Sequence, residues 1–255
     1  MCLVTVLQQD GGRIMKTVYW ASFPGGDENS LISELSYSEP VSLLKDLNPT
    51  SFFGMEASRC PAIINESKNT FKINSPIDLS ITFNSDFTRF NSKYAQDFDF
   101  IQHFIGTFGA EKVIQLSAPS YLFFCEESLT MTQLPPYYEQ SSFVDNCIGL
   151  SATFNINSWF RPVKPSFKLR ENKHTIEIDK KTSLMYLKFN TEEKINLVRF
   201  DGSAIHNSNI LNNIYRFKFH KKNPLVPTKL SVGYDAFLKA RYNKKIIKII
   251  KENLL

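Results

Sequence analysis

The sequence lacks an apolar run long enough to cross a membrane as a helix, which takes about 20 residues. It also lacks the signatures of several large enzyme classes: Gly-x-Gly-x-x-Gly, the phosphate-binding P-loop, His-Glu-x-x-His and Gly-x-Ser-x-Gly. These absences argue against dinucleotide-dependent enzymes, P-loop NTPases, His-Glu-x-x-His zinc proteases and α/β-hydrolases. The sequence therefore predicts no transmembrane helix, favours a non-enzymatic role and implies no cofactor.

Histidine is scarce as well. The four histidines are His103, His174, His206 and His220. Iron-dependent oxygenases with a jelly-roll fold bind their metal through two histidines and a carboxylate, which usually follows the first histidine by two residues. None of the four has Asp or Glu at that distance, which argues against this class of enzyme.

One acidic cluster remains a candidate metal site: Asp97, Asp99 and His103. If residues 97–99 form a strand, both carboxylates project from one face, near enough to share a cation. The alternative is a solvated strand edge on which Phe98 and Phe100 face the core, and the alternation favours this second interpretation. A metal-dependent, cupin-like enzyme is thus kept as an alternative function.

The four cysteines show no Cys-x-x-Cys motif and no Cys/His spacing typical of zinc sites. Cys125 and Cys147 lie in apolar, strand-like segments, where a free cysteine behaves as a small hydrophobic residue. Free, buried thiols in a reducing compartment are the simplest interpretation.

The stretch CPAIINESKNTF, residues 60–71, places Cys60 and Pro61 before a polar turn. We expect a strand to begin at Cys60, a turn over residues 65–69 and a returning strand over residues 70–73. A reactive thiol needs a nearby cation or helix N-terminus, and only Arg59 is apparent here. A buried structural Cys60 is favoured over a nucleophile.

The N-terminal segment has no basic start and no small-residue cleavage site, so secretion is not predicted. Gly-Gly-Arg-Ile before Met15 can be encoded by a purine-rich stretch that resembles a bacterial ribosome-binding site. We therefore expect Met15 to be the start and residues 1–14 to be a translated leader or a disordered N-terminus.

Short alternating segments predict a mainly β domain over residues 15–202. Strands are expected at residues 16–20, 70–74 and 78–84, and in seven segments between residues 120 and 200. Residues 183–190 are apolar on both faces and predict a central strand. A short helix is expected over residues 38–49, whereas 91–108 fit either a helix or a strand-turn-strand. The spacing is typical of a β-sandwich or jelly roll.

The last part of the chain, residues 203–255, has helical spacing instead. One helix is expected over residues 207–222 and a longer, amphipathic one over residues 234–255. The apolar stripe of the second should pack on the β domain; it consists of Tyr234, Leu238, Tyr242, Ile246 and Ile249, and it is widened by Phe237, Ile250 and Leu254.

Charge is distributed unevenly. Residues 216–255 hold eleven Lys or Arg against Asp235 and Glu252, a net charge of +9, whereas the rest of the chain has a net charge of −4. Such a segment can lie on anionic lipid, bind nucleic-acid phosphates or dock on an acidic partner. The absence of tryptophan argues against the lipid, and the favoured interpretation is that the lysines face water. The lysines concerned in the long helix are Lys239, Lys244, Lys245, Lys248 and Lys251.

Trp159 and Arg161 stand close together in the stretch SWFRP. A tryptophan and an arginine at this spacing form either a cation–π packing pair or part of a surface that binds a ligand. Packing is the favoured interpretation.

Three blocks of the sequence resemble uncharacterised proteins encoded by tailed, T4-like bacteriophages of marine bacteria. The blocks are CPAIINESKNTFKINSPIDL (residues 60–79), SWFRPVKPSFKLRENKHTIEI (residues 158–178) and SLMYLKFNTEEKINLVRF (residues 183–200). The resemblance covers roughly residues 15–202. It implies a phage origin and a location in the host cytoplasm or the virion.

Taken together, the sequence predicts a phage-encoded, non-enzymatic binding or minor structural protein. Its partner is expected to be a host or phage protein, or nucleic acid bound through residues 216–255.

Overall fold

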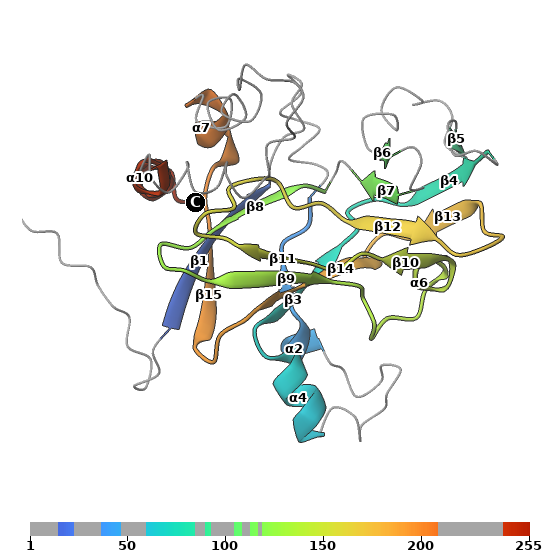
Figure 1. Cartoon of the computed structure of the whole chain (residues 1–255), viewed down its shortest axis with the longest axis horizontal. Coiled ribbons are helices and arrows are strands. Elements are labelled where there is room, and N and C mark those ends of the chain that lie inside the picture. The colour runs from blue at the N-terminus through green and yellow to red at the C-terminus, as the bar shows by residue number, and fades with distance from the viewer. Residues whose placement is uncertain are drawn as a thin grey trace, which may run out of the picture.

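The computed structural model describes residues 15–22, 37–46, 60–84, 90–92, 105–108, 113–116, 119–208 and 242–255. Within these residues the strands form four sheets, accompanied by short helices (Figure 1). The predicted mainly β fold and C-terminal helix are confirmed. The finer prediction of a jelly-roll sandwich is not established by these four sheets. None of the described helices is long and apolar enough to span a membrane.

The four sheets have the following strand orders. The first consists of β15 (Lys194–Arg199), β1 (Met15–Ser22) and β8 (Tyr121–Phe124). The second consists of β11 (Ala152–Asn155), β9 (Thr130–Leu134), β14 (Ser183–Phe189), β3 (Thr70–Asn74) and β2 (Val41–Ser42). The third consists of β10 (Cys147–Gly149), β12 (Ser166–Leu169), β7 (Val113–Leu116) and β6 (Ile105–Phe108). The fourth consists of β13 (Thr175–Ile178), β4 (Leu79–Phe83) and β5 (Phe90–Ser92).

The first sheet is a middle layer, because β1 is buried on both faces. Val18 and Trp20 pack on one side, in a core shared with β9, β14 and β3 of the second sheet. Tyr19 and Ala21 pack on the other side, in a core shared with the C-terminal helix α10 (Tyr242–Glu252). Burial of both faces also suits the parallel pairing of β1 with β15, since parallel strands are normally covered on both sides.

A separate core lies at the other end of the molecule, where the third and fourth sheets pack together (Figure 1). Helix α6 (Ser142–Asn146) contributes Phe143, whose ring meets that of Phe167 edge-on at 5.1 Å. At the opposite end, α10 packs against α7 (Gly202–Asn207) beside β1 and β15.

Most predicted strands are present close to their expected bounds, and β14 lies at the centre of the five-stranded sheet as predicted. The segment NCIGLSATFNI, however, is divided between β10 and β11, which belong to different sheets. Of the helix predicted over residues 38–49, the structure shows α2 (Leu43–Asp46), whereas Val41 and Ser42 pair with β3 instead, and residues 47–49 lie outside the described residues. The helix expected over residues 207–222 lies almost entirely outside the described residues.

The expected strand at Cys60 is wrong: residues 61–67 form the helix α4 (Pro61–Ser67). Cys60 is extended at the position before the helix, and Pro61 occupies the first turn, where its fixed φ suits a helix and its missing N–H is not needed. Cys60 is consequently half-exposed rather than buried. The returning strand begins at Thr70, as predicted.

The described cysteines carry free thiols, and Cys125 and Cys147 are buried as predicted. Burial raises the pKa of the Cys147 thiol to about 12 and also raises the pKa of Cys125. Both thiols therefore stay protonated near neutral pH and act as small core residues.

Tyr121 fixes the segment that precedes β2. Its side chain is fully buried, its hydroxyl donates to the Ser38 carbonyl at 2.7 Å, and it accepts from the Ser38 N–H at 3.1 Å. Burial raises the pKa of Tyr121 to about 12. The phenolate is thus much less stable in the folded protein than in the unfolded chain.

We therefore expect alkaline unfolding that depends on Tyr121. Because its pKa is raised on folding, its contribution is complete below about pH 10 and is lost as the pH rises through 12. A difference of two pKa units corresponds to about 3 kcal/mol. Urea unfolding at several pH values should show stability falling above about pH 10, and less steeply in Tyr121→Phe. Parallel slopes for the two proteins would contradict the assignment.

Candidate functional site

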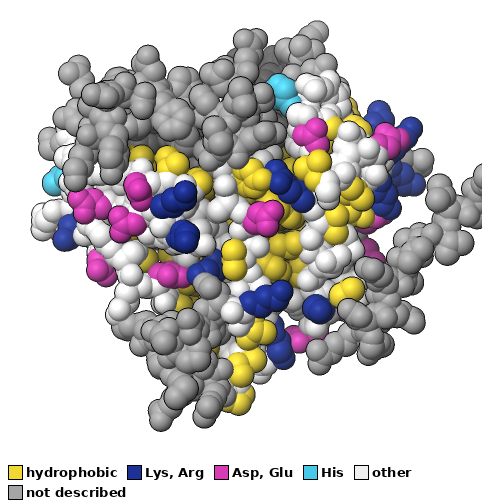
Figure 2. Space-filling model, turned by 180° about the vertical axis from the view of Figure 1, so that it is seen from behind, with side chains coloured by type: hydrophobic (Ala, Val, Ile, Leu, Met, Phe, Trp, Pro, Cys, Tyr) yellow, Lys and Arg dark blue, Asp and Glu magenta, His cyan; other side chains and the backbone are white. Residues whose placement is uncertain are grey.

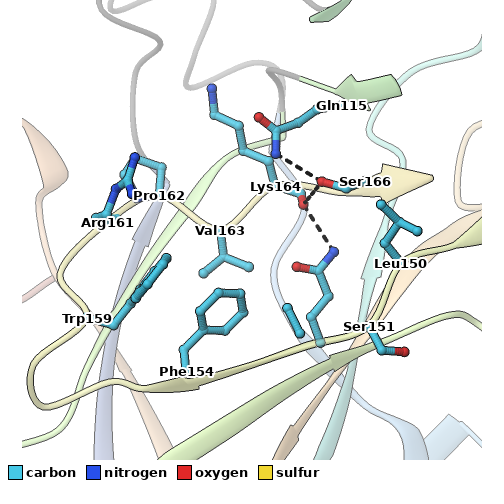
Figure 3. A pocket seen from close by; sticks show the side chains of 12 residues that line it. Gln115, Leu150, Ser151, Phe154, Trp159, Arg161, Pro162, Val163, Lys164 and Ser166 are labelled. Atoms are coloured by element: carbon cyan, nitrogen blue, oxygen red, sulfur yellow. Dashed lines mark hydrogen bonds between the residues drawn. The ribbon is translucent and has the colours of Figure 1, made fainter. Parts of the chain in front are cut away.

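A groove runs between β11 and the facing segment, residues 159–166, with a volume of about 500 Å³. Phe154 and Val163 point toward each other from its two sides (Figure 3). β9 and β7 each contribute a glutamine. The described residues that line the groove are Gln115, Gln133, Leu150, Ser151, Ala152, Phe154, Trp159, Arg161, Pro162, Val163, Lys164 and Ser166.

Backbone hydrogen bonds fix the chain at both ends of the groove. At one end the Asn155 carbonyl accepts from the N–H groups of Ser158 at 3.1 Å and Trp159 at 2.7 Å. At the other end Leu150 donates its N–H to the Ser166 carbonyl at 2.8 Å. Between these two closures β11 and the facing segment separate, and the groove occupies the space between them.

The facing segment directs the backbone groups of Val163 and Pro165 away from β11. Val163 exchanges two hydrogen bonds with Tyr121, at 2.7 and 3.0 Å, and the Pro165 carbonyl accepts from the Leu116 N–H at 2.9 Å. Pro162 and Pro165 have no N–H to offer. The Lys164 carbonyl points the other way but accepts from the side chains of Gln133 and Ser166 instead of from the backbone of β11.

One wall of the groove is apolar and aromatic. The rings of Phe154 and Trp159 are 4.9 Å apart and tilted by 47°, and both side chains are half-buried. The Arg161 guanidinium carbon lies 5.5 Å from the centre of the Trp159 ring. This distance is within the range of a cation–π interaction, so the ring helps to orient the guanidinium.

The opposite end is polar, and its groups are held in place by hydrogen bonds (Figure 3). Gln133 donates from Nε2 to the Lys164 carbonyl at 3.1 Å, and Ser166 donates to the same carbonyl at 3.2 Å. Gln115 donates from Nε2 to Ser166 Oγ at 2.9 Å. Gln133 is 5% exposed, which makes its amide a fixed part of the groove floor.

The charge of the groove has one sign. Arg161 and Lys164 both come from the segment opposite β11, and the described lining residues include no carboxylate. Burial lowers the pKa of the Lys164 ammonium, because it removes the ammonium from water. A negatively charged ligand would relieve that penalty.

The structure thus brings together the predicted pair Trp159 and Arg161, and it shows that they both pack on each other and line a groove. Their neighbour Lys164 and the two glutamines were missed by sequence reasoning. Lys164 lies in the same short stretch as Arg161, so the sequence could have pointed to it. The glutamines, in contrast, reach the groove only through strand pairing.

The basic residues of α10 lie elsewhere, on the helix whose apolar face covers the first sheet. Lys251 Nζ is 2.7 Å from Glu126 Oε1, and Lys248 Nζ is 3.9 Å from Glu252 Oε1. Carboxylates thus partly neutralise this face.

The remaining lysines of that group differ in their surroundings. Lys244 is exposed, and Lys245 Nζ lies 5.4 Å from the centre of the Tyr242 ring. Lys239 lies outside the described residues. On the face of the molecule seen in Figure 2, acidic and basic side chains are interspersed.

The predicted metal cluster, Asp97, Asp99 and His103, also lies outside the described residues. Among the residues that the structure does describe, no group of three or more His, Cys, Asp or Glu is placed to hold a metal ion.

Comparisons of the chain with protein-family models, with curated proteins and with solved structures found no match.

Proposed function

We propose that this is a phage-encoded, non-enzymatic binding protein that holds an anionic ligand in the groove beside β11. The resemblance of its three sequence blocks to phage proteins supports the origin, and the host cytoplasm is the location proposed. The groove supports the binding role.

The observation that carries the proposal is the combination of an aromatic wall with two cations and no carboxylate among the described lining residues. Ligand sites are typically concave and largely apolar, with a few fixed polar groups that orient the ligand. Trp159 and Phe154 supply the apolar contact, while Arg161 and Lys164 supply charge at one side. An anion attached to a flat or apolar group matches both features.

The groove is a better candidate than the basic face of α10. On α10, Lys248 and Lys251 already form ion pairs with carboxylates, so an incoming anion would have to compete with those partners. In the groove, Lys164 is withdrawn from water and has no ion pair within the described residues. Its charge is therefore available to a ligand.

We expect indole-3-acetate to bind more tightly than indole-3-acetamide, and tryptamine to bind least. The three compounds share one ring and differ in charge, so the order reports the charge preference of the groove. Nuclear magnetic resonance titration should shift the indole N–H signal of Trp159 and leave that of Trp20 in place. Trp20 is a matched internal reference because it is 4% exposed and lies in a closed core.

Arg161→Gln and Lys164→Gln should each weaken indole-3-acetate binding by about tenfold, the loss of about one charge-assisted hydrogen bond. Arg170→Gln and Lys173→Gln are matched controls, because both residues are exposed and do not line the groove. Equal binding of tryptamine and indole-3-acetate, or no shift at Trp159, would overturn the proposal.

A further inference from the structure

Among the described residues, the strand β11 has one paired edge and one open edge. It is the outer strand of the five-stranded sheet and pairs only with β9 in that sheet. The ladder continues past its end, where Ile156 donates to the Leu129 carbonyl at 2.9 Å. Backbone groups of an antiparallel strand point alternately to its two edges. Phe154 and Ala152 therefore bond to β9, and Thr153 points to the open edge.

Two contacts support this register. The Asn155 carbonyl, two residues from Thr153, accepts from Ser158 and Trp159 on the open side. The hydroxyls of Thr153 and Thr132, which are opposite each other, lie 3.1 Å apart. Side chains approach this closely in pairs that do not exchange backbone hydrogen bonds. The N–H and carbonyl of Thr153 therefore point to the open edge of β11, between Ala152 and Phe154, which line the groove.

Those groups have no bonding partner within the described part of the chain. The facing segment directs its Val163 and Pro165 backbone to Tyr121 and Leu116, as described above. An unpaired edge of this kind is a template for a further strand. Peptides bind many proteins by this route, with backbone hydrogen bonds giving affinity and side-chain pockets giving specificity.

We propose that the open edge of β11 accepts an extended, acidic segment of a partner protein as an added strand. The inference rests on the binding role proposed for the groove and names the class of ligand. The groove offers an aromatic wall at Trp159 and Phe154 and two cations, Arg161 and Lys164, without a carboxylate among its described lining residues. Alternating apolar and acidic residues in an added strand would meet these two features, since successive side chains point to opposite faces.

The open backbone of Thr153 favours a peptide over a nucleic acid. A single-stranded nucleic acid could stack on the aromatic rings and pair its phosphates with the cations. It could not use the donor and acceptor of Thr153 in strand register, because its backbone has no amide groups. Binding of a peptide should therefore depend on the backbone N–H and carbonyl of Thr153, whereas binding of a nucleic acid should not.

The test is a selection from a library of random peptides of about seven residues, near the usual length of a strand. The library is selected on the full chain and compared with selection on Thr153→Pro. Proline removes the outward N–H and leaves the ladder bonds of Ala152 and Phe154 intact, as at edge strands generally. We expect sequences rich in Asp and Glu, alternating with apolar residues, that are enriched on the wild-type chain alone.

The peptide that binds most tightly is then synthesised in two forms, each with every second backbone amide N-methylated. One form carries the methyl groups on the odd-numbered residues and the other on the even-numbered residues. One form should not bind and the other should bind nearly as well as the unmethylated peptide, because only alternate amides of an added strand face β11. This arm needs no protein variant, so it stays informative if Thr153→Pro fails to fold. Hydrogen exchange of the Thr153 amide should slow by at least about tenfold in the complex.

Several results would overturn the inference. These are enrichment of Lys-rich peptides, selection of the same peptides on Thr153→Pro as on the wild-type chain, equal affinities of the two methylated forms, or no enrichment at all. Tighter binding of octathymidylate, unaffected by Thr153→Pro, would favour a nucleic acid instead. If indole-3-acetate still shifts the Trp159 signal, only the strand addition fails; if it does not, the binding role of the groove fails with it.

Discussion

Ile246→Ala and Ile250→Ala should each lower the free energy of unfolding by about 2 to 5 kcal/mol, the range for truncating a fully buried isoleucine. Both side chains are 0% exposed and lie in one core with Leu122, Phe124 and Phe200 of the β domain. This loss is a large part of the total free energy of unfolding, which is about 5 to 15 kcal/mol for a typical domain. Urea unfolding followed by circular dichroism measures it.

Lys244→Gln and Lys248→Gln provide the matched controls in the same helix. Lys244 is exposed, and Lys248 has an exposed side chain whose ion pair with Glu252 spans one helical turn. Surface pairs of this kind contribute about 0.3 to 0.5 kcal/mol. Isoleucine variants that unfold at the same urea concentration as these controls would show that α10 is not an integral part of the fold.

The chain end adds to the attachment of α10. Leu255 donates its N–H to the Arg199 carbonyl at 3.1 Å, and Asp201 donates to the Asn253 carbonyl at 2.9 Å. The residues after the helix thus bond directly to the end of β15 and to the start of α7. Because these bonds persist when a side chain is truncated, we expect the isoleucine variants to lose stability without the helix detaching.

How far the sequence predicts this helix depends on the face considered. Helical spacing places Ile246 on the buried stripe, and the structure buries it. The predicted stripe runs through Ile249, which is only half-buried, and its predicted widening includes Ile250, which is fully buried. Residues four apart lie on the same face of a helix, so the contact with the β layer buries the pair at 246 and 250.

The strands were predictable, but their grouping into sheets was not. Alternation reports which faces of a strand are buried, and this was enough to place β14 at the centre of a sheet. It does not identify the partner strand. β1 pairs with β15, which lies far away in the sequence, and no local pattern encodes that choice.

The same distinction applies to the groove. Trp159 and Arg161 could be selected because they are close in the sequence and chemically distinctive. Gln115 and Gln133 could not, since their positions depend on how β7 and β9 are placed beside the facing segment. Thr153 has an unremarkable side chain, and its proposed role lies in a backbone direction that only the register of β11 with β9 reveals.

Asn69 is a further residue whose role depends on distant parts of the chain. The sequence placed it in a turn, and its φ of 53° is indeed in the left-handed region. Its Nδ2 donates to the carbonyls of Thr191 and Glu193, both at 2.8 Å, and its Oδ1 accepts from the Ile195 N–H at 3.1 Å. One amide side chain thus joins the start of β3 to the connection between β14 and β15.

Asn69→Ala should lower the free energy of unfolding by about 3 to 5 kcal/mol, because it removes these three bonds and because alanine tolerates the left-handed region less well than asparagine does. Asn69→Gly should lose about 1 kcal/mol less, because glycine adopts this conformation without strain. The comparison separates the backbone contribution from that of the hydrogen bonds. Urea unfolding near neutral pH measures both variants against the wild-type chain.

Asn69→Asp tests the direction of the hydrogen bonds. It keeps the oxygen that accepts from Ile195 but turns a second oxygen toward the carbonyls of Thr191 and Glu193, which cannot donate to it. The carboxylate is therefore disfavoured in the folded protein, and the pKa of this aspartate should lie above its ordinary value. A raised pKa on folding makes the loss of stability smallest below about pH 4 and larger as the pH rises to 7. Urea unfolding of Asn69→Asp and wild type at both pH values measures this difference. A difference that does not change with pH would mean that the amide nitrogen does not face these carbonyls.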